Sequence, residues 1–325
     1  MLLNSSSRLA RGYTAALVSA LILSTTGVFI GYLTRAYGLP ALVLAFWRDL
    51  FVMFSLLPLL GILRPRLLRV ERGHLPFLLG YGLVLSLFNS LWTLSVVLNG
   101  AAVATVLVYC SSAFTALLGW RLLRERLGAG RWLAVAVSLG GCVLVAEAYD
   151  PAVWRSNLLA IAAGILSGLL YAIYSLMGRA AAQRGLNPWS TLLYTFGFAA
   201  AFLLVYNLLP FKLPGAAATP AELLWLGNAW AGWGVLLLLA AGPTLAGFGL
   251  YNVSLGYLPS SLANLIVTLE PAFTAVLAYF FLGERLTAVQ LAGSLLILGA
   301  VVLLRIHEGR LAGQPTAGAE TVNYY

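Results

Sequence analysis

The chain has 325 residues, of which 61% are hydrophobic and only 9% are charged. Soluble domains carry about 25% charged residues, so this composition excludes an ordinary soluble fold. The net charge of +9 would suit nucleic-acid binding, but the apolar content favours a lipid bilayer.

Long apolar runs recur along the whole chain. A bilayer core about 30 Å thick needs roughly 20 apolar residues in a helix, whereas the strands of a membrane β-barrel would alternate apolar and polar residues. A signal peptide is an alternative for the first run, because Arg8 and Arg11 precede it, but its core is too long and no cleavage site follows. We predict ten membrane helices, at residues 13–33, 41–63, 75–97, 100–122, 131–148, 157–178, 188–209, 230–254, 260–282 and 287–305.

The basic residues are distributed unevenly between the predicted loops. With the N-terminus inside, 14 of the 19 basic residues fall on the inner side and four on the outer side, while Arg48 lies within a span. This asymmetry follows the positive-inside rule and places both termini in the cytoplasm. It accounts for the net charge without nucleic acid, and it leaves basic loops that can touch anionic membrane lipids.

Two segments of the sequence repeat each other. "SAFTALLGWRLLRERL" at 112–127 resembles "PAFTAVLAYFFLGERL" at 271–286, which lies 159 positions later. We therefore divide the chain into repeats at 1–148 and 149–309, followed by a disordered tail at 310–325. Five spans in each repeat give the halves opposite orientations in the membrane. Inverted repeats are typical of secondary transporters, although a structural protein that arose by duplication is an alternative.

The sequence resembles the EamA family of the drug/metabolite transporter superfamily. The resemblance rests on the two "AFTA…ERL" segments, on "LEP" at 269–271 and on the arginine in "AFWRDLF" at 45–51. It covers roughly residues 13–305 and implies an all-α membrane protein with ten transmembrane helices in two inverted five-helix repeats. It also implies a location in the bacterial cytoplasmic (inner) membrane and the export or exchange of small metabolites. One departure is visible, because Ser111 and Ser112 stand where the second repeat has Glu270 and Pro271.

Three ionisable residues lie deep in the predicted spans, namely Arg48, Asp49 and Glu270. A charge at the bilayer centre costs at least ~2.5–3.5 kcal/mol, so such residues suggest function. Adjacent helical residues point about 100° apart, which makes Arg48 and Asp49 poor partners. At similar predicted depths, Arg48 is expected to pair with Glu270 or with an anionic group of a substrate. A purely structural pair, or bonds to free carbonyls, is the alternative.

Glu270 is followed directly by Pro271, inside a segment that is otherwise apolar. The carboxylate could bind a cationic group of a substrate, such as an α-amino group, or could carry a proton that couples transport. Proline removes one backbone hydrogen bond, which frees the carbonyl of Val267 one turn earlier. A freed carbonyl is tolerated in a membrane where it lines a cavity or meets a neighbouring helix, and a simple kink is the alternative.

Polar residues form a stripe on each of two repeat-related spans. A stripe of this kind is either a cavity lining or a contact between the two helices. Its members on the ninth span are Ser260, Asn264, Thr268 and Pro271, and their counterparts on the fourth are Ala101, Thr105, Tyr109 and Ser112.

Further residues are candidates for a cavity lining or for helix packing. Asn89, Tyr171 and Tyr174 lie in mid-span rather than at a membrane interface, so they could line a cavity. The small-residue patterns "GVFIG" at 27–31 and "GILSG" at 164–168 predict close helix packing.

Together these features predict a secondary active transporter that works by alternating access. The expected substrates are small amphipathic metabolites, above all amino acids, and a proton is a candidate coupling ion. A lipid flippase or scramblase, or a multidrug-cation efflux protein of the same fold, is the alternative. The sequence has no protease or phosphate-binding motif, so we expect no enzyme activity, no cofactor and no metal site. We expect a monomer or a weak homodimer.

Overall fold

The structure is a computed structural model of the chain. It describes residues 2–111, 113–115, 117–118, 129–147, 149–210, 213–255, 257 and 266–312. Across these ranges the chain forms helices joined by turns, and no strand occurs in them. The last helix continues to Ala312, three residues into the segment predicted as a tail. The rest of the tail lies outside the described residues.

The first half begins with three long helices, α1 (Leu2–Tyr37), α2 (Ala41–Leu63) and α3 (Leu75–Asn99). The short helix α4 (Ala101–Val108) follows, and α6 (Ala129–Val145) completes this half. The second half contains α7 (Pro151–Gln183), α8 (Pro188–Leu208), α9 (Trp230–Leu239), the π-helical η4 (Ala240–Gly247), α10 (Phe248–Leu255), α12 (Glu270–Leu282) and α13 (Ala288–Ala312).

The described helices match the ten predicted spans. Six are long and apolar enough to cross a membrane, and four shorter apolar helices occupy the positions predicted for the fourth, fifth, ninth and tenth spans. The second span agrees at both ends, and the sixth begins at its predicted residue, since the membrane-length part of α7 starts at Asn157, where the helix is kinked. The protein is therefore an all-α, multi-pass membrane protein, as predicted.

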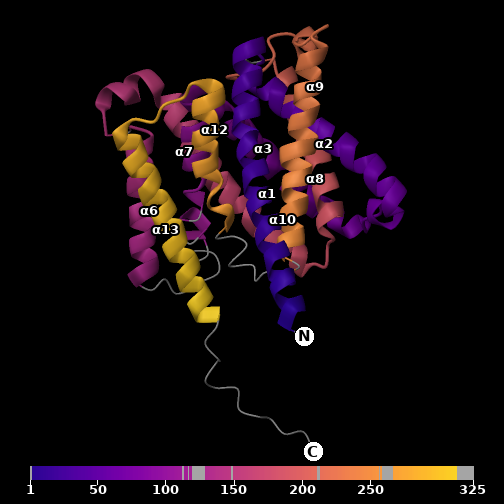
Figure 1. The fold of residues 1–325 in the computed structure, drawn as a ribbon. Helices are drawn as coiled ribbons and strands as arrows, with labels where there is room; N and C mark the ends of the chain where they lie inside the picture. Colours follow the sequence, from indigo (N-terminus) through magenta and orange to yellow (C-terminus); the bar gives the residue numbers. More distant parts are fainter. Residues whose placement is uncertain are drawn as a thin grey trace, which may run out of the picture.

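The two halves interlock instead of folding side by side. The most extensive helix pairs, α6 with α13, α3 with α7 and α8, α2 with α8, and α1 with α12 and α10, each join one half to the other. Figure 1 shows α6 beside α13 at one edge of the bundle, and α1 running along α9 and α10. A movement of one half relative to the other would therefore shift contacts throughout the bundle.

Glycines make the closest of these packings possible. A Cβ at Gly27 would press on Ala101 of α4, and one at Gly31 would clash with Leu282 of α12. In α7, side chains at Gly164 and Gly168 would collide with residues of the α4 segment. The interpretation of both small-residue patterns as helix packing is confirmed.

The two repeat-related spans are broken at equivalent positions. Helix α4 ends at Val108 and a turn follows at Tyr109 and Cys110, while the turn before α12 lies at Thr268 and Leu269, 159 positions later. Glu270 is therefore the first residue of a helix and does not interrupt a continuous one. Discontinuous helices of this kind line the binding sites of many secondary transporters.

Candidate functional site

Arg48 and Asp49 form a buried ion pair on α2. Nε and Nη2 of Arg48 both donate to Oδ1 of Asp49 at 3.2 Å, and the two side chains are 4% and 0% exposed. The prediction that these neighbours are poor partners is wrong. Their Cβ atoms do point apart, but the arginine side chain is long enough to fold back along the helix.

Asn89 completes the coordination of this carboxylate from the adjacent helix. Its Nδ2 donates to Oδ2 of Asp49 at 2.6 Å, so both carboxylate oxygens are satisfied and α2 is tied to α3. The guanidinium carbon of Arg48 also lies 5.7 Å from the ring centroid of Trp92, within the range of a cation–π contact. The positive and negative charges balance, which lowers the cost of burying both.

Arg48 retains unused hydrogen-bonding capacity. Its Nη1 has no hydrogen-bond partner among the residues that the structure describes, although the side chain is almost fully buried. A guanidinium is always charged and presents planar pairs of donors that match a carboxylate. The arrangement can thus accept a further anionic group without first losing Asp49.

Aromatic rings from α3 and α7 lie next to this cluster. Phe88 lies 5.2 Å from Tyr171 and 6.3 Å from Trp92, measured between ring centroids, and Tyr174 lies 4.7 Å from Tyr81. The structure thus brings Tyr171 and Tyr174 together, although it does not test whether they line a cavity. Sequence reasoning missed Tyr81 and Phe88, whose spacing of seven residues places them on one helical face.

A second polar cluster lies at the break before α12. The hydroxyl of Tyr109 lies 3.0 Å from both the carbonyl oxygen of Val267 and Oε2 of Glu270. Pro271 occupies the first turn of α12, where a missing N–H is tolerated. The carbonyl of Val267 is bonded by a side chain from the other repeat, as expected for a carbonyl without a helical partner, but the helix break before Glu270 accounts for this without the proline.

Arg48 does not pair with Glu270 in this structure. Arg48 is seven residues from the start of α2, or about 10 Å at the helical rise, and Glu270 is twelve residues, or about 18 Å, from the end of α12 at the same end of the bundle. The two residues therefore differ in depth by several ångströms. The expected pairing fails because the side chain of Arg48 folds back onto Asp49 of its own helix.

The remaining candidates belong to the polar stripes. Thr105 and Thr268 are buried, and Thr268 lies in the turn before α12. Asn264 lies outside the described residues, as do Ser112 and Ser260. The bond from Tyr109 to the backbone of Val267 supports the interpretation of the stripes as a helix contact. No cluster of three or more potential metal ligands occurs among the described residues.

The chain is similar to known transporters along most of its length. A model of the EamA-like transporter family matches twice, at residues 10–146 and 158–306. An uncharacterized transporter of Archaeoglobus fulgidus is 30% identical over 90% of this chain and 95% of its own. The threonine/homoserine exporter RhtA of Escherichia coli K12 is 29% identical over 83% of this chain and 80% of its own.

Two further similarities agree with a transporter and with the fold. A probable amino-acid metabolite efflux pump of Salmonella typhimurium is 26% identical over 82% of this chain and 86% of its own. A crystal structure that covers 93% of this chain and 98% of its own superposes with a TM-score of 0.57 at 17% identity, which supports the fold alone. Because the two family matches together span most of the chain, the chain belongs to the EamA-like transporter family, within the drug/metabolite transporter superfamily.

Proposed function

We propose that the protein is a secondary active exporter or exchanger of amino acids and related small amphipathic metabolites, working by alternating access. The observation that carries the proposal is the buried Arg48–Asp49–Asn89 cluster, which keeps a guanidinium nitrogen free among the described residues. Relatives of nearly the same length that are named as exporters of threonine, homoserine or amino-acid metabolites favour the same substrate class.

The chemistry of the cluster suits a zwitterion. Nη1 of Arg48 can donate to the α-carboxylate of an amino acid, while Asp49 keeps the resting site neutral. A zwitterion has no net charge, so its entry adds no net charge to a low-dielectric environment. A phosphate dianion would bring uncompensated charge, because Arg48 is the only basic residue predicted at mid-membrane depth, whereas the other arginines inside predicted spans lie at span ends.

Glu270 is the proposed binding partner for the ammonium group of the substrate or for a coupled proton. Its carboxylate accepts a single hydrogen bond from the described residues, that of Tyr109, so it can exchange this partner for a substrate ammonium group or for a proton. Its position at the start of a helix, next to a break, allows such a change without unfolding a helix interior. Both roles predict that a carboxylate is needed at this position.

Counterflow in proteoliposomes tests the proposal. Vesicles loaded with unlabelled compound are assayed for uptake of the same labelled compound, with separate panels of amino acids, nucleosides, organic cations and headgroup-labelled lipid. We expect exchange of one or more amino acids and its loss in Arg48→Gln. Arg69→Gln is the matched control, because Arg69 is exposed in the loop after α2. Exchange of lipid or cations without amino acids would overturn the proposal.

A further inference from the structure

The first turn of α4 is capped by a residue that lies far away in the sequence. Backbone N–H groups of Ala101 and Ala102 donate to Oε1 and Oε2 of Glu284, each at 3.1 Å. The residue at the usual capping position, Gly100, has no side chain with which to do this. Helix N-termini are normally capped by a neighbouring Ser, Thr, Asp or Asn. Here the cap belongs to the other repeat.

The backbone at Gly100 makes room for this carboxylate. Gly100 has φ +85, a conformation that favours glycine, and a Cβ there would lie 2.9 Å from the carboxyl carbon of Glu284. Any larger residue would strain the turn and push the carboxylate away. The local sequence of the first repeat is therefore built to accept Glu284.

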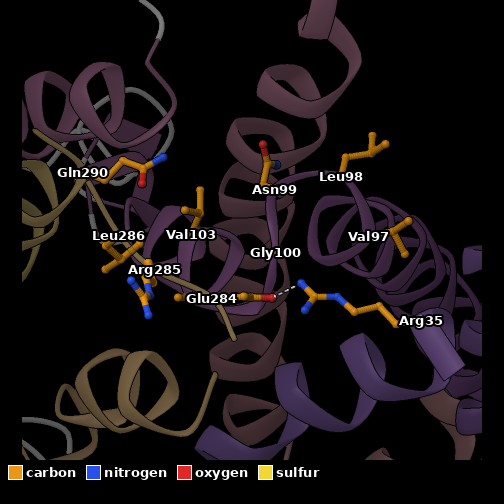
Figure 2. A pocket seen from close by; sticks show the side chains of 11 residues that line it. Arg35, Val97, Leu98, Asn99, Gly100, Val103, Glu284, Arg285, Leu286 and Gln290 are labelled. Carbon is orange, nitrogen blue, oxygen red and sulfur yellow. Dashed lines mark hydrogen bonds and ion pairs between the residues drawn. The ribbon is translucent and has the colours of Figure 1, made fainter. Parts of the chain in front are cut away.

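Arg35 adds a third element to the contact. One of its guanidinium nitrogens lies 2.6 Å from Oε1 of Glu284, and another donates to the carbonyl oxygen of Leu282. Figure 2 shows the Glu284 carboxylate next to Arg35 and the Gly100 turn, and all three residues line a pocket of about 320 Å³. The end of α1, the start of α4 and the turn after α12 thus meet at one carboxylate.

These contacts fasten the α4–α12 pair at one end, while Tyr109 and Glu270 fasten it at the other. The Glu284 end is open to water at Arg35, whose side chain is 49% exposed, while the side chain of Glu284 is 13% exposed. When Glu284 leaves, water can hydrate the carboxylate, the guanidinium and the N–H groups of α4. Release at this end therefore costs little, in contrast to a buried ion pair.

We propose that Glu284, Arg35 and the N-terminus of α4 form a latch that closes this end of the bundle and opens once in each transport cycle. The proposal rests on alternating access, and the positive-inside rule places the latch on the outer side. A local cap would hold α4 in every state, whereas a cap from the other repeat holds it only while α12 is docked. Whether the latch is closed therefore depends on the relative position of the two halves.

Thiol labelling tests the latch without any substrate. Thr105→Cys is introduced with Cys110 and Cys142 replaced by alanine, because Thr105 is buried on α4 one turn below Ala101. A membrane-impermeant maleimide is added to the protein in lipid nanodiscs, where it reaches both faces. With Glu284→Gln or Arg35→Gln, we expect labelling about tenfold faster, which corresponds to ~1.4 kcal/mol less stabilisation of the closed state.

The control is Glu222→Gln, since Glu222 is bonded within the loop before α9, to the N–H of Ala218. It should leave the labelling rate unchanged. The charge swap Arg35→Glu/Glu284→Arg should also label fast, because an arginine cannot cap a helix N-terminus. Unchanged labelling in both single variants would reduce the contact to a static cap and overturn the proposal, as would failure of both to fold. Accelerated labelling without amino-acid exchange would reject the proposed substrate and leave the latch intact.

Discussion

Two regions of the protein hold acidic side chains at membrane depth, and they are built in different ways. Asp49 is closed in by Arg48 and Asn89, which occupy both of its oxygens within a fully buried cluster on α2 and α3. Glu270 lies at a helix break between α4 and α12, and Tyr109 supplies its hydrogen bond from the described residues. One carboxylate is fixed by its neighbours, whereas the other can change partner.

The difference assigns separate tasks to the two regions. A charge-balanced pair in which both carboxylate oxygens are bonded resists rearrangement in a low dielectric, so the Asp49 region suits a fixed anchor for a substrate group. A carboxylate at a discontinuity between the two repeats suits the moving part of the cycle. Substitutions that break the buried pair by removing one partner should therefore affect folding most, and substitutions in the second region should affect transport more than stability.

Removing the charge of Asp49 should have the largest effect on stability. Asp49→Asn leaves Arg48 buried without a counter-ion, and breaking a buried pair costs about 3–5 kcal/mol. Thermal unfolding of the purified protein, followed by tryptophan fluorescence, should show a clearly lower midpoint. Glu71→Gln, at an exposed loop position, is the control. An unchanged midpoint for Asp49→Asn would mean that the pair is not buried in the membrane.

Glu270→Gln should leave the fold intact and impair transport. The amide oxygen can still accept the hydrogen bond of Tyr109, so the free energy of unfolding should change by less than about 1 kcal/mol. Net transport should fall about tenfold or more, equivalent to at least ~1.4 kcal/mol in the barrier, because neither a proton nor an ammonium group has a carboxylate to bind. Proteoliposome transport measured across a range of pH is the test. Normal activity at every pH would remove Glu270 from the mechanism.

Tyr109→Phe should have a smaller effect. It removes the hydroxyl that bridges the Val267 carbonyl and Glu270, and a typical hydrogen bond contributes about 0.5–1.5 kcal/mol. Unfolding midpoints of the single variants and of Tyr109→Phe/Glu270→Gln form a double-mutant cycle. Strict additivity in that cycle would show that the two side chains are not coupled.

Pro271→Ala should have the smallest effect. The first repeat is broken at Tyr109 and Cys110 without a proline, so the break before α12 should survive the substitution. A proline in the first helical turn contributes about 0.4–1 kcal/mol, chiefly through the unfolded chain. Counterflow should continue near the wild-type rate. Loss of exchange in a stable Pro271→Ala protein would show that the proline itself shapes the break.

Much of the fold could be predicted because a membrane helix needs an apolar run long enough to cross the bilayer, and such runs are visible in the sequence. The limits of α2, for example, agree with the predicted span at both ends. The breaks themselves were not predicted, because each apolar run was read as one helix across its polar residues, Ser111 and Ser112 in the first repeat and Glu270 in the second. The Arg48–Asp49 pair was missed because helical periodicity gives the direction of a Cβ atom, not the path of a long side chain.

The Glu284 cap could not be predicted from either segment alone, because the capped helix and the capping acid lie in different repeats. Gly100 has no side chain, so the N-terminus of α4 shows no capping signal in its own sequence. The acid that caps it lies in the "GERL" motif of the second repeat, which marks the duplication but does not identify a partner. Only the interlocking of the halves brings the two together.

The central claim is that the Arg48 cluster exists for transport and not for stability. The triple variant Arg48→Met/Asp49→Leu/Asn89→Leu tests it directly, because replacing a buried ionic cluster by apolar residues is often neutral or stabilising by about 1–4 kcal/mol. Amino-acid counterflow is measured in proteoliposomes containing this variant, after its thermal unfolding has been compared with that of the wild type. We predict a variant at least as stable as the wild type that exchanges no amino acid. A stable variant that exchanges amino acids at the wild-type rate would contradict the account.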